Sequence, residues 1–282
     1  MSSSPVSRVG TVPRRMDSIR LDAAVAARGL ARSRTHAARL ISNGYVRVDG
    51  TPVVKASFPV TEAHAVTVDA VDRYVSRGAN KLLAALDAFD GVRVDGRLAL
   101  DAGASTGGFT QVLLERGARQ VIAADVGHGQ LDPIIAREER VVQVEGFNLR
   151  YATPETLAGA SGVSEPVELV VADLSFISLG FVLAPLQSVA TPDADFVYLV
   201  KPQFEVGRTG VKEGIVKNPA LRADSITNVL WAAYDLGLST AGIIPSPIAG
   251  NAGNLEYLVW FNRDVGQHPT EWLERVTEMT GA

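Results

Sequence analysis

The sequence RLALDAGASTGGFT, residues 97–110, decides the fold of the larger part of this chain. The apolar residues Leu98, Ala99 and Leu100 predict a buried strand that ends at Asp101. The small residues that follow let the backbone approach a ligand closely before a helix begins at Gly107. A strand, a loop of this kind and a helix in succession indicate a ligand-binding α/β domain, in which ligands lie beyond the carboxyl ends of the strands.

Apolar segments rich in Val, Ile and Ala alternate with helical segments on both sides of this loop. A helix is predicted in NKLLAALDAF before the loop, and a long helix from Pro219 to Leu236 after it. The expected strands, in chain order, lie in RLALDAG, QVIAADVG, VVQVEG, VELVVADLS, DFVYLVKP, STAGIIPSPIAG and NLEYLVWF. This alternation predicts an α/β fold with a mostly parallel seven-stranded sheet, helices on both faces and a final antiparallel hairpin.

The residues before the linker DRYVSRG follow a different pattern. Residues 1–16 have no periodicity and are expected to form a flexible tail. Helices are predicted from Met16 to Gly29 and from Ser33 to Gly44, then two short strands around Asp49-Gly50 and a third at AVTVD. This order, ααβββ, predicts a small α+β domain.

Composition separates the two parts further. Residues 1–81 hold 13 Lys and Arg against 6 Asp and Glu, whereas residues 82–282 hold 14 Lys and Arg against 25 Asp and Glu. The first part is therefore basic and suits binding to a polyanion.

The absence of Cys excludes disulfides and thiolate chemistry, and four scattered His argue against a metal site. No run reaches the roughly 18 apolar residues of a membrane span, and the N-terminus lacks the apolar centre of a secretory signal. A cytoplasmic protein without a metal or membrane partner is expected.

Arginines gather on the second predicted helix and on its approach. Charge alone leaves open whether they form a solvated helix surface or an RNA-binding face. The segment GLARSRTHAARLISNGYVRVDG, residues 29–50, resembles the S4 RNA-binding domain. The resemblance implies that basic side chains grip phosphates and RNA shape. The residues expected to do so are Arg20, Arg28, Arg32, Arg34, Arg39, Arg47 and Lys55.

Polar residues near the glycine-rich loop indicate the kind of cofactor. The loop GASTGG lacks the G-x-G-x-x-G pattern that grips pyrophosphate, and Asp101 before it would repel phosphate but attract a sulfonium or amino group. Asp125 ends the next strand, where a carboxylate can accept both ribose hydroxyls of an adenosine, and Asn148 is suited to frame the adenine. The pattern favours S-adenosylmethionine over NAD or ATP; a tight turn with Asp125 as an ordinary cap is the alternative. The loop residues expected to contact the cofactor are Gly103, Ala104, Gly107, Gly108 and Phe109.

Four charged residues lie in or beside apolar segments, where a charge is tolerated only when it is paired. Asp173 ends VELVVADLS, Lys201 follows FVYLV, and Glu256 lies in NLEYLVWF. Lys81 lies on the helix that enters the domain. All four are expected to converge at the sheet edge that holds the cofactor, as a catalytic set or, alternatively, as a structural ion-pair network.

This Lys-Asp-Lys-Glu order, with the glycine-rich loop between the first two, resembles the FtsJ-type ribose 2′-O-methyltransferases. With the S4-like module in front, residues 17–263 resemble the TlyA family, some of whose members are labelled haemolysins. The resemblance implies a Rossmann-like class I methyltransferase fold, S-adenosylmethionine as cofactor, and methylation of cytidine ribose in 16S ribosomal RNA, 23S ribosomal RNA or both. One departure is the linker, where relatives often carry Trp between Arg and Val and this chain has Arg73-Tyr74-Val75.

The resemblance divides the chain and implies roles for the four charged residues. The division is a flexible tail at 1–16, an S4-like domain at 17–72, a linker at 73–78 and an FtsJ-like methyltransferase domain at 79–282. Lys201 is predicted to be the general base, its pKa lowered by desolvation and by a neighbouring cation, Lys81. Asp173 and Glu256 are predicted to orient the lysines.

Two matters stay open in the sequence. The segment between Lys201 and Pro219 is either a mobile surface loop or a cover over the substrate with Arg208, Lys212 and Lys217 as RNA contacts. Three other functions are a membrane-active haemolysin, an RNA-binding assembly factor without turnover and a pseudouridine synthase. The charged set disfavours the second and the glycine-rich loop the third, while nothing amphipathic supports the first. A monomer that acts on RNA in ribosomal subunits is favoured.

Overall fold

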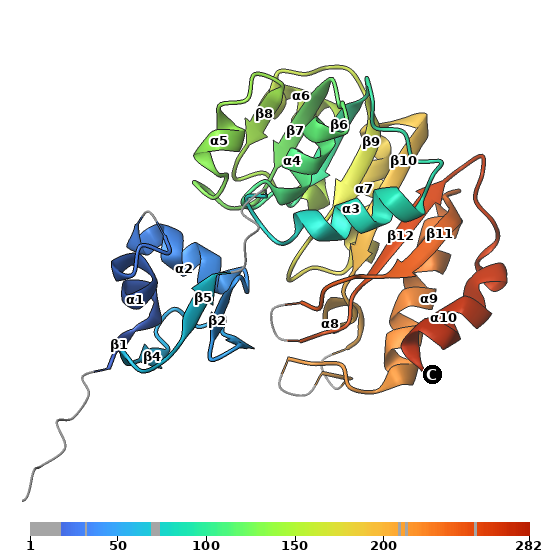
Figure 1. Ribbon diagram of the computed structural model, residues 1–282. Coiled ribbons are helices and arrows are strands. Elements are labelled where there is room, and N and C mark those ends of the chain that lie inside the picture. The colour runs from blue at the N-terminus through green and yellow to red at the C-terminus, as the bar shows by residue number, and fades with distance from the viewer. Residues whose placement is uncertain (1–17, 32, 69–73, 208–209, 212–213, 251–252) are drawn as a thin grey trace, which may run out of the picture. The chain divides into compact units, whose positions relative to one another are not determined.

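The computed structural model divides the chain into two units between Arg73 and Tyr74 (Figure 1). The residues that the structure describes are 18–31, 33–68, 74–207, 210–211, 214–250 and 253–282. The expected tail at 1–16 lies outside the described residues, as do three of the predicted RNA contacts, Arg32, Arg208 and Lys212.

Two helices form the core of the N-terminal unit. Apolar residues recur every three or four positions in α1 (Leu21–Ala27) and α2 (Arg34–Ser42), so each helix has one apolar face, and these faces meet. Ser33 caps α2 by accepting a hydrogen bond from the His36 backbone N–H. The buried core consists of Leu21, Ala24, Val25, Ala37, Leu40, Ile41, Val46, Val48 and Val60.

Short antiparallel strands complete this unit. β2 (Val46–Val48) pairs with β3 (Thr51–Pro52) and with β5 (Val66–Val68). The turn between β2 and β3 has φ of 50° at Asp49 and 80° at Gly50, both left-handed, as the Asp-Gly dipeptide predicts. A second pair, β1 (Ile19–Arg20) with β4 (Pro59–Val60), was not predicted, because strands of two residues show no alternation. The first helix therefore begins only at Leu21.

The second unit is built on a seven-stranded sheet with the order β11-β12-β10-β9-β6-β7-β8 (Figure 1). Neighbours from β10 to β8 pair in parallel, and β12 pairs antiparallel with both β10 and β11. This arrangement confirms the predicted fold class. The strands are β6 (Leu98–Ala102), β7 (Gln120–Ala124), β8 (Val141–Val144), β9 (Val167–Ala172), β10 (Ala190–Val200), β11 (Ser239–Pro245) and β12 (Tyr257–Asn262).

Helices cover both faces of this sheet, and residues that alternate along a strand supply the two apolar layers. In β6, Ala99 packs in the layer under α3 and α4, whereas Leu98 and Leu100 pack in the opposite layer with α6, α7 and α9. The helices are α3 (Ala79–Ala88), α4 (Gly108–Glu115), α5 (Pro133–Ala136), α6 (Pro154–Ser161), α7 (Leu183–Ser188), α8 (Pro202–Glu205), α9 (Pro219–Asp235) and α10 (Leu273–Thr280), with short 3-10 turns η1 (Leu149–Tyr151), η2 (Leu179–Phe181) and η4 (Pro269–Trp272).

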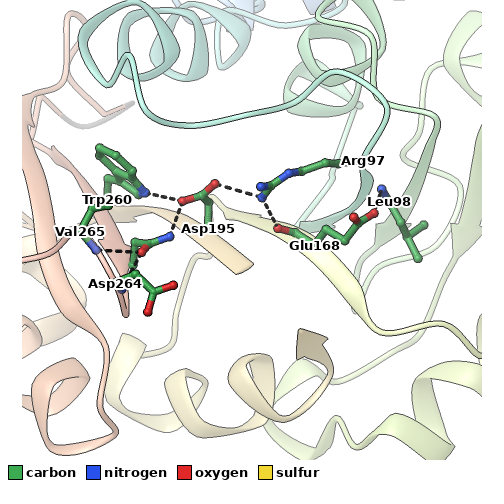
Figure 2. Close-up of polar contacts among 8 residues, drawn as sticks. Arg97, Leu98, Glu168, Asp195, Trp260, Asp264 and Val265 are labelled. Carbon is green, nitrogen blue, oxygen red and sulfur yellow. Dashed lines mark hydrogen bonds and ion pairs between the residues drawn. The ribbon is translucent and has the colours of Figure 1, made fainter. Parts of the chain in front are cut away.

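A buried charge network ties the strands together at the amino end of β6 and β9 (Figure 2). Asp195 accepts hydrogen bonds from Arg97 at 3.0 Å, from the Trp260 indole at 2.9 Å and from the Asn262 amide at 2.8 Å. The Arg97 guanidinium also donates to the backbone carbonyl of Glu168 at 2.9 Å. One carboxylate thus joins the start of β6 to β10 and β12.

Removal of this carboxylate should destabilise the sheet strongly. Asp195→Ala leaves a largely buried guanidinium and two buried N–H donors without their acceptor, so the free energy of unfolding should fall by about 3 kcal/mol. Urea unfolding measures the change. Glu139→Ala, which removes an exposed acid before β8, is the control and should change stability by less than about 0.5 kcal/mol. Equal effects of the two substitutions would show that the network adds nothing.

Candidate active site

Four charged side chains meet at the carboxyl edge of the parallel strands. Lys81 comes from α3, Asp173 directly follows β9, Lys201 directly follows β10, and Glu256 directly precedes β12. Lys201 Nζ lies 2.6 Å from Asp173 Oδ1, and Lys81 Nζ lies 3.5 Å from Asp173 Oδ2 and 2.7 Å from Glu256 Oε2. The structure therefore brings the four residues together in the alternating order Lys201, Asp173, Lys81, Glu256.

The alternation makes these charges tolerable in the interior. Lys81, Lys201 and Glu256 are buried, and two ammonium groups are matched by two carboxylates. Burial alone would raise the pKa of Asp173, but the ammonium groups of Lys201 and Lys81 outweigh burial and hold that pKa below its ordinary value. Asp173 therefore stays a carboxylate at neutral pH and orients both lysines.

The loop after Asp173 adds contacts that the sequence did not predict. Lys201 Nζ donates to Ser175 Oγ at 2.9 Å. Phe176 follows with a left-handed φ of 65°, and its side chain is 91% exposed. Its ring lies 5.3 Å from that of Phe204 on α8. The only signal in the sequence is the stretch Ser175-Phe176-Ile177-Ser178, which begins two residues after the strand-end acid, and such a short motif is not specific.

Glu205 holds the end of this loop against α8. Its carboxylate accepts a hydrogen bond from Ser178 Oγ at 2.6 Å and another from the Leu179 backbone N–H at 2.9 Å. Burial raises the pKa of Glu205, and the two hydrogen bonds only partly oppose that rise. The segment from Asp173 to Ser178 is thus fixed at one end by Lys201 and at the other by Glu205.

Asp101 is fully buried at the end of β6. Its Oδ2 accepts a hydrogen bond from Thr110 Oγ1 at 2.6 Å, while its Oδ1 has no hydrogen-bond partner among the described residues. Burial raises the pKa of Asp101 to about 7, against the opposing effect of the Thr110 hydrogen bond. An unpaired buried oxygen beside the glycine-rich loop is a position where a donor from a ligand would be stabilised.

The glycines of the loop are required by the protein's own packing. A Cβ on Gly103 would lie 2.9 Å from the backbone oxygen of Asp173, and one on Gly108 would lie 2.2 Å from Ser76 Oγ. Gly107 has φ of 90°, and its Cβ would meet Leu131 at 2.8 Å. These three positions let β6 and α4 approach neighbouring segments. Their predicted contacts with a cofactor would have to come from backbone atoms.

A small hollow lies between the loop and the ends of β7 and β8. Asp125 lies in it, with Oδ2 accepting from the Ser105 backbone N–H at 2.9 Å and Oδ1 from that of Gly127 at 2.7 Å. Because each carboxylate oxygen can accept a second hydrogen bond, this leaves room for ribose hydroxyls. The lining residues are Ala104, Ser105, Ala123, Asp125, Gly127, Gln130, Leu131, Gln143, Val144 and Glu145.

Two of the predicted cofactor residues do not line this hollow. Phe109 is buried in the apolar layer under α3 and α4. Asn148 does not line the hollow; its side chain caps η1 by accepting from the Arg150 backbone N–H at 3.1 Å. Gln143 and Glu145, which do line the hollow, were not predicted, because polar residues on an edge strand are ordinary.

The predicted RNA-binding side chains of the N-terminal unit differ in the contacts they make within the protein. Arg28 donates to the backbone carbonyls of Thr61 and His64, both at 2.9 Å, so it is engaged in the fold. Arg20 and Arg34 both contact the buried carboxylate of Asp22. Arg39 lies on α2, Arg47 on β2, and Lys55 is exposed after β3.

The segment between α8 and α9 is anchored in its second half. The Asn254 side chain accepts from the Val216 backbone N–H at 3.1 Å and donates to the Gly214 carbonyl at 2.7 Å. Asn254 is buried two residues before Glu256. Lys217 in this segment is exposed.

Two family models match the chain, an S4 domain over residues 19–66 and an FtsJ-like methyltransferase over residues 74–263. The fold and the site therefore define an FtsJ-like methyltransferase that carries an S4 domain. The chain is 52% identical over 244 residues to the 16S/23S rRNA (cytidine-2'-O)-methyltransferase TlyA of Mycobacterium tuberculosis, covering 86% of this chain and 88% of that relative. The chain belongs to the TlyA family.

Other members of the same family carry a different name. Hemolysin A of Brachyspira hyodysenteriae is 37% identical over 86% of this chain and 99% of its own length. A solved structure named as a hemolysin from Streptococcus thermophilus is 34% identical, covers 94% of this chain and 97% of its own, and superposes with a TM-score of 0.72.

Within the residues that the structure describes, no helix has the length and apolar character to cross a membrane. The same residues contain no group of three or more acidic or imidazole side chains placed to bind a metal ion.

The pH dependence of stability tests the state of Asp101. Its pKa of about 7 in the folded protein, against 3.8 for an ordinary Asp, means that the folded protein keeps a proton that the unfolded chain releases. The stability contributed by this proton is present at low pH and is lost as the pH rises to about 7. Asp101→Asn lacks this loss, so its stability relative to wild type should rise by about 2–4 kcal/mol from about pH 5 to about pH 8. Urea unfolding at both pH values measures the free energy of unfolding of the variant relative to wild type. The same relative stability at the two pH values would contradict a buried, protonated Asp101.

Proposed function

We propose that this chain transfers the methyl group of S-adenosylmethionine to the ribose 2′-hydroxyl of a cytidine in ribosomal RNA. The observation that carries the proposal is the alternating set of Lys201, Asp173, Lys81 and Glu256 beside the glycine-rich loop. The M. tuberculosis relative at 52% identity is named for this reaction. The S4 domain would hold the RNA, and a ribosomal substrate implies that the enzyme acts in the cytoplasm.

The hollow beside β7 fits the nucleoside part of the cofactor. Ala104, Leu131 and Val144 supply apolar surface for a purine, while the Asp125 carboxylate can accept the ribose hydroxyls. In its ionised form, Asp101 has an unpaired Oδ1 that is suited to accept a hydrogen bond from the amino group of the methionine part. Polar and apolar groups on the two sides of the loop thus match an amphipathic, positively charged ligand.

The chemistry needs a base for the ribose hydroxyl. When bound, S-adenosylmethionine supplies a methyl group on a positively charged sulfur, so a C–O bond forms as the C–S bond breaks and the hydroxyl loses its proton. The Lys201 ammonium would first have to release a proton to water, and the neutral Nζ would then take the proton of the hydroxyl. Asp173 and Ser175 fix Nζ from two sides, which leaves its remaining position for the substrate. Lys81 joins Asp173 to Glu256 and so aims the carboxylate that orients Lys201.

Two substitutions of Lys201 separate a base from a fixed positive charge. Lys201→Ala should lower kcat for methyl transfer to purified, unmethylated ribosomal subunits by about 10²–10⁴-fold. Lys201→Arg keeps a cation but cannot release a proton near neutral pH, so it should be as inactive as the alanine variant. Calorimetry should show unchanged S-adenosylmethionine binding in both variants, because Lys201 does not line the hollow. Activity restored by arginine would mean that Lys201 only positions the substrate.

Phe176 is the side chain best placed to contact a nucleobase. An almost fully exposed aromatic ring in a left-handed backbone conformation is unfavourable in the free protein, and its loop is fixed by Lys201 and Glu205. RNA enzymes hold unstacked bases against aromatic rings. Phe176 directly follows Ser175, which accepts a hydrogen bond from Lys201, and this position suits the base of the nucleotide whose ribose reacts.

Phe176→Ala should therefore affect the RNA and spare the cofactor. Loss of one base–aromatic stack is worth about 1–3 kcal/mol, so kcat/KM for ribosomal subunits should fall by about 10–100-fold. The Kd for S-adenosylmethionine should stay unchanged. Leu273→Ala, which removes an exposed apolar side chain from α10, is the control and should retain full activity. A Phe176→Ala enzyme with normal kcat/KM would remove the ring from the mechanism.

A further inference from the structure

A buried acid lies in the basic N-terminal unit beneath two arginines. Arg20 donates from Nε to Asp22 Oδ1 at 3.1 Å and from a terminal nitrogen to Oδ2 at 2.9 Å. Arg34 approaches the same carboxylate with Nε 3.3 Å from Oδ2 and a terminal nitrogen 3.5 Å from Oδ1. The Asp22 side chain is 7% exposed, whereas those of Arg20 and Arg34 are 51% and 59% exposed. One carboxylate therefore supports two solvent-facing guanidinium groups.

The two arginines come from different elements of the fold. The contact that they have in common is the carboxylate of Asp22. Arg20 lies in β1, and Arg34 is the first residue of α2. A free arginine side chain samples many rotamers, and that freedom is lost when it binds a phosphate. Contact with Asp22 removes this freedom before RNA arrives. Each guanidinium has five N–H donors, so donors remain for phosphate oxygens on the side that faces solvent.

The negative charge of Asp22 opposes RNA binding, whereas the ordering of the two arginines favours it. The hydrogen bond from Arg20 holds the pKa of Asp22 at about 2, so the carboxylate is ionised at every pH at which RNA binds. A fixed negative charge under a phosphate-binding pair weakens the attraction of a polyanion. Simple electrostatics therefore predicts that removal of Asp22 tightens RNA binding, whereas pre-ordering of the arginines predicts the reverse.

We infer that Asp22 is a positioning residue that holds Arg20 and Arg34 as one phosphate-binding pair, and that this ordering outweighs its unfavourable charge. The inference rests on the proposed RNA-binding role of the N-terminal unit. Arg28 differs from this pair, because its guanidinium is already used on two backbone carbonyls. Arg20 and Arg34, which contact Asp22, are therefore positioned for a ligand, whereas Arg28 stabilises the fold.

The test is binding of the full chain to unmethylated ribosomal subunits at several salt concentrations. Asp22→Asn keeps the size of the side chain and the acceptor for the Ala23 backbone N–H, but loses the ion pairs. Its Kd should rise about tenfold, the value expected from two arginines that must be ordered on binding. Glu62→Gln, which removes an exposed acid from the same unit, is the matched control and should bind as tightly as wild type or slightly more tightly.

A second variant keeps the test decisive if Asp22→Asn unfolds the N-terminal unit in a urea titration. Asp22→Glu leaves the net charge unchanged but moves the carboxylate, and it should also weaken binding. Arg34→Gln should cost less affinity in the Asp22→Asn background than in wild type. Wild-type-like or tighter binding by folded Asp22→Asn or Asp22→Glu overturns the inference and leaves the proposed function intact. Failure of the wild-type chain to bind the subunits would overturn the proposed function itself.

Discussion

A charge withdrawn from water is tolerated only beside an opposite charge, and this constraint governs the carboxyl edge of the sheet. Two ammonium groups and two carboxylates meet there from α3, from the ends of β9 and β10, and from the start of β12. Because Asp173 contacts both lysines, a shift of any one of these elements would leave a buried charge without its partner. The pairing of the strands and the geometry of the site are therefore fixed by the same contacts.

The two ends of the sheet show what distinguishes a structural network from a site. At the amino end, both oxygens of Asp195 accept hydrogen bonds from side chains of the protein itself (Figure 2). At the carboxyl end, Asp101 keeps a buried oxygen without a partner, and Phe176 presents its ring to solvent. The polar atoms of Asp195 are thus paired within the protein, whereas the second edge has a buried oxygen without a partner among the described residues and an exposed ring.

The sequence predicted the sheet well because its strands are long apolar runs separated by helices, and strand ends placed Asp173 and Lys201 at one edge. It could not predict contacts set by tertiary packing. The sequence did not show that a Cβ on Gly108 would meet Ser76. Nor did it show that the Asn148 side chain caps a short helix. Nothing in a pattern of arginines distinguishes Arg28, which binds backbone carbonyls, from Arg34, which contacts Asp22.

The most direct measurement is the chemical identity of the product. Purified protein, unmethylated ribosomal subunits and S-adenosylmethionine with a labelled methyl group would be incubated together, and the RNA digested to nucleosides for mass spectrometry. If Lys201, held by Asp173 and Ser175, acts as the general base for a ribose hydroxyl, the label will appear as 2′-O-methylcytidine. Label on a nucleobase, or no label with folded protein that binds the cofactor, would contradict this account of the site.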